Sequence, residues 1–142
     1  ADHIHLRDIV LGQASCTDSN YAAQYHLPGT YAPIASFSLL EAAAQTAREL
    51  HLPVHVGNLL STDVFYQESS PLPQWAAMGV LATEMESAAL YMNAAAAGAE
   101  ALCIVTVSDC PLRNEFTTAE ERQSTFTDMM QLALETVKHI HQ

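Results

Sequence analysis

Hydrophobic and polar positions alternate along the chain in blocks, and these blocks predict strands and helices in turn. Runs rich in apolar and β-branched residues predict strands at residues 5–12, 53–60 and 101–109, with a shorter strand at 80–83. Gly57 interrupts the second of these runs. Because glycine weakens a strand or marks a bulge, we expect an irregularity at this position.

Helices are predicted where apolar residues recur at every third or fourth position. In chain order they are residues 36–50, a short piece around Trp75, a helix that starts at residue 84 or 86 and ends at 97, and residues 118–140. Ser38 and Glu41 predict an N-terminal capping box in the first helix, and Gly98 a C-cap of the third. Strands that alternate with helices favour a mostly parallel sheet covered on both faces, so the predicted fold class is α/β.

The last predicted helix carries a cation on its apolar face. Arg122 lies four residues before the first member of an apolar stripe made by Phe126, Met129, Met130, Ala133, Val137 and Ile140. In one interpretation the side chain reaches solvent and pairs with Glu121 or Asp128. In the other it points toward Asp109 or toward the negative charge of a ligand at the mouth of the sheet.

Asp109 ends the apolar run at residues 101–109. A buried strand of this kind delivers its last side chain to the carboxyl edge of the sheet, where open α/β sheets bind their ligands. We therefore expect a site that contains the Asp109 carboxylate.

A second candidate constellation is formed by Glu84, Met85 and Glu86. If the segment is extended, the two carboxylates share one face and can accept hydrogen bonds from vicinal sugar hydroxyls, while the methionine packs on the sugar ring. If the segment is helical, the two glutamates instead complement the helix dipole in the first turn. Residue spacing leaves both interpretations open.

Size, composition and charge narrow the function classes. The chain has 142 residues, of which 49% are hydrophobic, and this predicts one domain with its own core. Sixteen Asp and Glu residues against five Lys and Arg residues give a net charge of −11, which disfavours nucleic acid and anionic membranes. Three cysteines, without a recognisable signal peptide or long apolar span, predict a cytoplasmic location. The seven histidines lack the companions of a zinc site, so no metal is predicted.

Several motifs together resemble the bacterial, hexameric type of purine nucleoside phosphorylase. The motifs lie at residues 14–19, 56–61 with Asp63, 65–66, 84–86, 106–109 and 117–123. They occur in the order and at the spacings of that family across the whole chain. The resemblance implies a nucleoside phosphorylase-like three-layer α/β/α fold with a mixed, mostly parallel sheet, incomplete on its N-terminal side. It also implies phosphorolysis of purine ribonucleosides and deoxyribonucleosides to the free base and the pentose 1-phosphate.

The resemblance also implies roles for individual residues. Asp109 would be the general acid that protonates purine N7, and Arg122 would approach it to assist the proton transfer. Glu86 would hold the ribose hydroxyls, Met85 would pack beneath the sugar, and Phe65 would stack near the base. The remaining substrate-binding positions would be Tyr66, Ser108, Glu84 and Thr83.

The same resemblance has implications for position 83, for the partners of the chain and for the portion of the domain that the chain represents. Thr83 stands where the family usually has valine, which would change the contacts with the base and leave the chemistry in place. Inorganic phosphate would be the co-substrate, with no metal or organic cofactor, and the assembly would be a homohexamer built as a trimer of dimers. Residues 1–142 would form the C-terminal portion of a single domain that lacks the N-terminal phosphate-binding part. The alternative is a truncated, catalytically impaired module that binds nucleoside or supports assembly.

Overall fold

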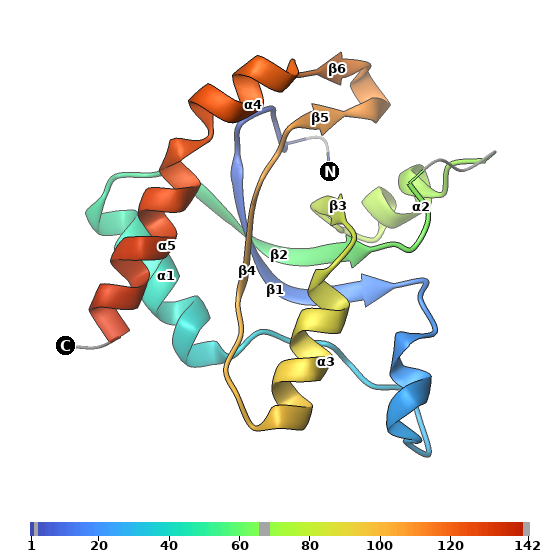
Figure 1. Cartoon of the computed structure of the whole chain (residues 1–142). Coiled ribbons are helices and arrows are strands. Elements are labelled where there is room, and N and C mark those ends of the chain that lie inside the picture. The colour runs from blue at the N-terminus through green and yellow to red at the C-terminus, as the bar shows by residue number, and fades with distance from the viewer. Residues whose placement is uncertain (2, 66–68, 141–142) are drawn as a thin grey trace.

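The computed structural model describes residues 1, 3–65 and 69–140, and its centre is a four-stranded sheet (Figure 1). The strands are β1 (Ile9–Thr17), β2 (Val54–Ser61), β3 (Ala82–Glu84) and β4 (Cys103–Thr106). Their order is β3-β2-β1-β4. The first three are parallel and β4 is antiparallel to β1, so the predicted α/β class with a mixed, mostly parallel sheet is confirmed.

Helices cover both faces of this sheet (Figure 1). They are α1 (Phe37–Glu49), α2 (Leu72–Ala77), α3 (Ser87–Ala97), α4 (Ala119–Thr125) and α5 (Thr127–Ile140), with 3-10 turns η1 (Tyr21–Tyr25) and η2 (Pro111–Arg113). A hairpin of β5 (Asp109–Cys110) and β6 (Glu115–Phe116) leads into α4. α1 and α5 pack together on one face and α3 lies on the other, which gives the predicted three layers. Within the described residues, no helix is both long and apolar enough to span a membrane.

The main core lies between the sheet and the α1–α5 pair. Side chains alternate between the two faces of a strand, so Ile9 and Leu11 of β1 point to the same side. There they pack with Ala43 and Ala47 of α1 and with Leu132 of α5, all of them buried. This cluster fixes the sheet against two helices that lie far apart in the sequence.

The opposite face is organised around Tyr91 of α3. Its buried hydroxyl donates a hydrogen bond to the Gly12 carbonyl at 2.5 Å and accepts one from the Cys103 N–H at 3.0 Å. An added Cβ at position 12 would lie 2.6 Å from a Leu59 methyl and 3.0 Å from the tyrosine oxygen, so any other residue would require the Leu59 side chain to shift. The register of β1 and β2 shifts just after Gly12, so the bulge lies in β1, opposite the Gly57 at which we expected an irregularity.

The predicted continuous helix over residues 118–140 is wrong. α4 ends at Thr125, the φ of −94° and ψ of 43° at its C-cap Phe126 interrupt the helical conformation, and α5 starts at Thr127. Only part of the predicted apolar stripe faces the core. Leu132 and Thr136 are buried and Met129 packs against the core, whereas Met130, Val137 and Ile140 are exposed.

Two other predictions about element ends are corrected. The first strand starts at Ile9, later than expected, and the strand predicted over residues 101–109 stops at Thr106. Ser38 does not cap α1, because the helix begins after Ser36 and the Ser38 hydroxyl donates to the Glu100 carboxylate. A complete capping box is instead formed at the start of α4 by the pair Thr118 and Glu121.

Candidate functional site

Asp109 and Arg122 lie in direct contact. Asp109 is the first residue of β5, and its Oδ1 lies 3.3 Å from Nη2 of Arg122 in the middle of α4. The arginine side chain is 48% exposed and the aspartate side chain 27%, so the pair lies at the surface and is open to a ligand. Of the two interpretations of Arg122, the structure shows the one in which it points toward Asp109. Its neighbour Glu121 pairs with Arg7 instead.

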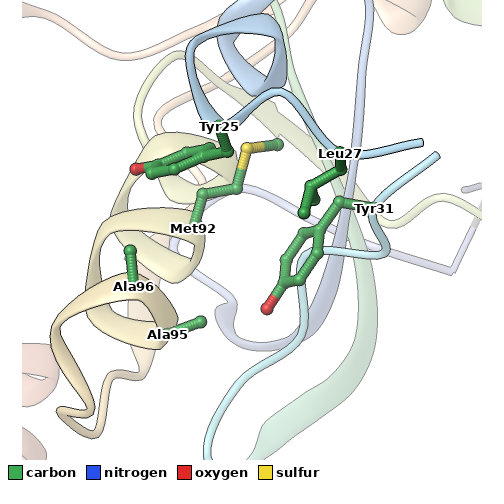
Figure 2. Close-up of a pocket in the computed structure, with 6 residues that line it drawn as sticks. All are labelled: Tyr25, Leu27, Tyr31, Met92, Ala95 and Ala96. Atoms are coloured by element: carbon green, nitrogen blue, oxygen red, sulfur yellow. The ribbon is translucent and has the colours of Figure 1, made fainter. Parts of the chain in front are cut away.

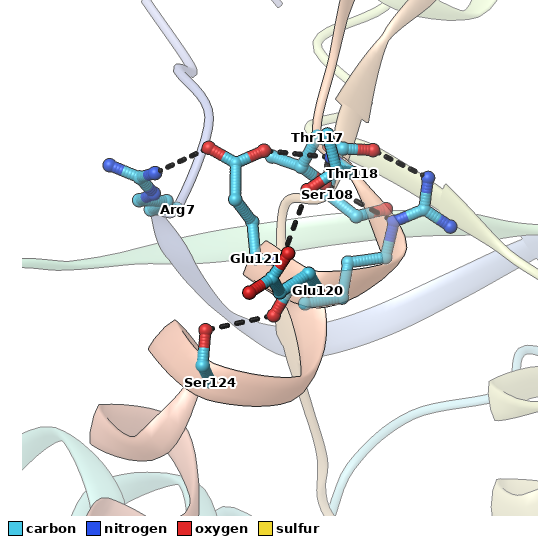
Figure 3. Close-up of polar contacts among 8 residues, drawn as sticks. Arg7, Ser108, Thr117, Thr118, Glu120, Glu121 and Ser124 are labelled. Atoms are coloured by element: carbon cyan, nitrogen blue, oxygen red, sulfur yellow. Dashed lines mark hydrogen bonds and ion pairs between the residues drawn. The ribbon is translucent and has the colours of Figure 1, made fainter.

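Thr117 links Arg122 to Ser108, the residue directly before Asp109; Figure 3 shows Thr117 beside Ser108. This residue is buried, and its hydroxyl donates to the Ser108 carbonyl at 2.7 Å. The Arg122 guanidinium donates to the Thr117 hydroxyl at 3.2 Å and to its carbonyl at 2.9 Å. No role of Thr117 is predicted from the sequence, although its place directly before a Thr-x-x-Glu cap is a usable signal.

The Asp109 carboxylate receives hydrogen bonds on both oxygens. The Ser108 hydroxyl donates to Oδ2 at 2.7 Å, while Arg122 donates to Oδ1. Both contacts stabilise negative charge on this carboxylate, which is the state in which an acid is left after it has given up its proton. The arrangement therefore suits a group that transfers a proton to a basic atom of a ligand.

Glu84 is used by the protein itself. Its Oε2 accepts hydrogen bonds from the backbone N–H groups of Glu86 and Ser87 at 2.7 and 2.6 Å, and its Oε1 accepts from the Ser87 hydroxyl at 2.5 Å. These donors belong to the start of α3, whose first N–H groups have no partner within the helix. Glu84, which the resemblance places among the substrate-binding residues, thus uses both carboxylate oxygens to cap this helix.

Glu86, Met85 and Thr83 are exposed around the same turn. The strand ends at Glu84 and Glu86 is the N-cap residue of α3, so the two carboxylates do not share one face of an extended segment. Burial, together with the negative charges of Glu84 and Glu86, raises the pKa of the Cys103 thiol to about 12. Both carboxylates therefore lie near β4, the strand that leads toward Asp109.

The loop after β2 carries Phe65, which is 71% exposed. Asp18 holds this loop, since its two oxygens accept hydrogen bonds from the Thr62 hydroxyl at 2.7 Å and from the Asp63 N–H at 3.0 Å. The resemblance motif at residues 14–19 thus has a structural role. Tyr66, predicted to bind substrate, lies outside the described residues.

Among the described residues, no hydrogen bond or ion pair joins the Asp109–Arg122 pair to the Glu84–Glu86 turn. Two surface hollows of about 310 and 300 Å³ are lined by other side chains. Figure 2 shows the first, between Tyr25, Leu27 and Tyr31 on one side and Met92, Ala95 and Ala96 of α3 on the other. The described residues also contain no group of three His, Cys, Asp or Glu side chains placed to hold a metal ion.

We expect Glu84→Ala to lower the free energy of unfolding by about 1–3 kcal/mol, because it leaves partly buried donors at the start of α3 without an acceptor. Glu135→Ala is the matched control: it removes an exposed carboxylate paired with Lys138 and should change stability by less than about 0.5 kcal/mol. Chemical denaturation followed by circular dichroism measures both. Equal effects of the two substitutions would show that the cap is not stabilising.

Comparison with known proteins finds a matching family profile and relatives of similar sequence. The profile of the phosphorylase superfamily matches residues 1–141. The DeoD-type purine nucleoside phosphorylase of Colwellia psychrerythraea is 49% identical over 140 residues, which cover 96% of this chain and 58% of the relative. That of Bacillus velezensis is 48% identical over 134 residues, which cover 94% of this chain and 58% of the relative. The chain therefore spans a little more than half the length of these relatives.

Proposed function

Because the chain belongs to the phosphorylase superfamily, we propose that it forms the part of a purine nucleoside phosphorylase that holds the nucleoside and protonates the departing purine. The observation that carries this proposal is the contact between Arg122 and Asp109 at 3.3 Å. The similarity to DeoD-type purine nucleoside phosphorylases supports the choice of substrate class. Residues 1–142 would then be the C-terminal portion of a single phosphorylase domain.

In the proposed reaction, the bond between purine N9 and ribose C1′ breaks while a phosphate oxygen forms a bond to C1′. The electron pair of the broken bond moves into the purine, and the Asp109 carboxyl group gives its proton to N7, so the base leaves as a neutral molecule. Arg122 and the Ser108 hydroxyl then stabilise the carboxylate that remains. Proton transfer of this kind typically accelerates a reaction by about 10²–10⁴-fold.

Nucleoside binding is assigned to the turn between β3 and α3 and to the loop after β2. We propose that Glu86 accepts hydrogen bonds from the ribose hydroxyls, that Met85 packs beneath the sugar, and that Phe65 lies near the base. The exposure of all three side chains is compatible with this role. Ser108 and Thr83 would complete the base pocket, with Glu84 acting through the cap that fixes the position of Glu86.

The remaining features of the proposal come from the family. Inorganic phosphate is the proposed co-substrate, with no metal or organic cofactor. The proposed assembly is a homo-oligomer, the hexamer of the family, and the proposed location is the cytoplasm. The net charge of −11 disfavours nucleic acid and anionic membranes as partners.

A second candidate function is nucleoside binding without turnover. Four of the five Lys and Arg residues, all of them described, already pair with a carboxylate: Arg7, Arg113, Arg122 and Lys138. The fifth, Arg48, is exposed on α1. This pairing leaves few cations to deliver phosphate to C1′, which favours a module that binds nucleoside but does not cleave it.

Inosine cleavage with and without phosphate separates the two candidates. Phosphate-dependent release of hypoxanthine by the chain supports the phosphorylase. Calorimetric binding of inosine without any release supports the binding module, and Glu86→Gln should then weaken binding by about three- to tenfold through the loss of charge-assisted hydrogen bonds. If the chain neither releases hypoxanthine nor binds inosine, both candidate functions are refuted.

A further inference from the structure

Arg7 lies just before β1 in a backbone conformation that is rare for residues other than glycine. Its φ is 73°, in the left-handed region, where a residue with a side chain persists only if the surroundings hold it. Its N–H donates to the Val107 carbonyl at 2.8 Å, and the Val107 N–H donates to the Asp8 carbonyl at 2.9 Å. The backbone at Arg7 is thereby fixed to the link between β4 and β5, two residues before Asp109.

The Arg7 side chain contacts Glu121, the residue directly before Arg122 in α4 (Figure 3). Its Nη2 donates to Oε1 of Glu121 at 3.1 Å. The second oxygen of Glu121 accepts a hydrogen bond from the Thr118 N–H at 2.7 Å, and the Glu121 N–H donates to the Thr118 hydroxyl at 3.1 Å. Arg7 therefore holds the first turn of α4 by the residue that directly precedes Arg122.

α4 depends on such polar contacts for its position. It has seven residues, and its described side chains are exposed or only partly buried. Within the described part of the chain it packs extensively against no other element. A segment with few apolar contacts has low local stability, so a small number of tethers determines where it lies. Tethers among the described residues include the Arg7–Glu121 pair, the hydrogen bonds from Arg122 to Thr117 and the contact of Arg122 with Asp109.

We infer that Arg7 is a positioning residue for the proposed proton transfer: it joins the backbone that carries Asp109 to the helix that carries Arg122 and so keeps the two side chains in contact. The inference rests on the proposed function, because it assigns Arg7 a part in that reaction. Arg7 acts through Glu121 and α4, so its loss affects the alignment of Arg122 more than the binding of nucleoside.

Three variants test this inference through kcat and KM for inosine. Arg7→Asn removes the guanidinium with a residue that tolerates the left-handed conformation, Arg7→Lys keeps the charge, and Glu121→Gln removes the carboxylate charge but keeps an acceptor for the cap. Because the pair is 55% and 40% exposed, the expected fall in kcat is about two- to fivefold for Arg7→Asn and for Glu121→Gln, with KM nearly unchanged. The double variant Arg7→Asn with Glu121→Gln should lose no more kcat than either single variant. Arg7→Lys should retain most of kcat.

Lys138→Asn is the matched control, since it breaks an exposed pair with Glu135 on α5 and makes the same change in charge. It should leave kcat unaltered. A second measurement does not require turnover: amide hydrogen exchange at residues 119–124 should become faster in Arg7→Asn and stay unchanged in Lys138→Asn. If the chain does not release hypoxanthine, the proposed function fails, and the exchange rates still decide whether Arg7 holds α4. Unchanged exchange in α4, or additive losses of kcat in the double variant, would overturn the inference.

Discussion

Asp109→Asn is expected to lower phosphate-dependent release of hypoxanthine from inosine by about 10²–10⁴-fold. The amide has nearly the shape of the carboxyl group and can still accept a hydrogen bond from Arg122, but it has no acidic proton to give to purine N7. The loss should fall mainly on kcat, because the proton is transferred in the transition state and contributes little to nucleoside binding. Initial rates over a range of inosine concentrations at saturating phosphate measure the effect.

Asp128→Asn is the control for this substitution, because Asp128 is exposed in the first turn of α5, away from the proposed chemistry. It should change kcat by less than about twofold, as expected for an exposed position without a role in the site. Circular dichroism spectra and denaturation midpoints establish that both variants are folded. A folded Asp109→Asn variant with the turnover of the wild type would remove the proposed acid from the mechanism.

Leu132→Ala is expected to lower the free energy of unfolding by about 2–5 kcal/mol, because it leaves a cavity in the core between the sheet, α1 and α5. Leu132 is 0% exposed and packs with Ile9, Leu11 and two alanines of α1. The matched control lies two residues away on the same helix: Leu134 is 66% exposed, so Leu134→Ala should cost less than about 0.5 kcal/mol. Urea denaturation of both variants measures the difference.

The comparison also tests which face of α5 is turned toward the core. If Leu134→Ala lowered the free energy of unfolding more than Leu132→Ala, the face of α5 that packs against the sheet would be the one that carries Leu134. Equal losses would show that both faces are covered in solution, for example by a second copy of the chain. Either result would disagree with the orientation that α5 takes after the break in the helix at Phe126.

Much of the fold could be predicted because its signals are local. Apolar runs and helical spacing are periodic within a single element, so the sequence predicts β2, α1 and α3 at nearly their observed positions and β4 within a longer run. The contact of Arg122 with Asp109 was one of two interpretations, and it was suggested by a cation on a face expected to be apolar. The position of a single arginine, Arg122, within one predicted helix was enough to suggest this contact.

Other features depend on distant partners or on the conformation of single residues. Arg7 contacts a residue 114 positions away, and no local pattern marks such a pair. Neither proline nor glycine marks the interruption at Phe126, which therefore escaped prediction. Glu84 is placed among the substrate-binding residues by the resemblance, which does not show what its carboxylate contacts within the chain. The strand ends at Glu84, and the unpaired N–H groups of α3 then take up its carboxylate.

The proposed transfer of the Asp109 proton to N7 of the departing purine can be tested with a substrate that does not need this proton. In 7-methylinosine, N7 already carries a methyl group and the base a positive charge, so the bond to C1′ breaks without an acid. Asp109→Asn should therefore lose about 10²–10⁴-fold on inosine and only a few-fold on 7-methylinosine, measured as the ratio of variant to wild-type kcat on each substrate. Equal losses on the two nucleosides would contradict the claim, and so would a wild-type chain that cleaves neither.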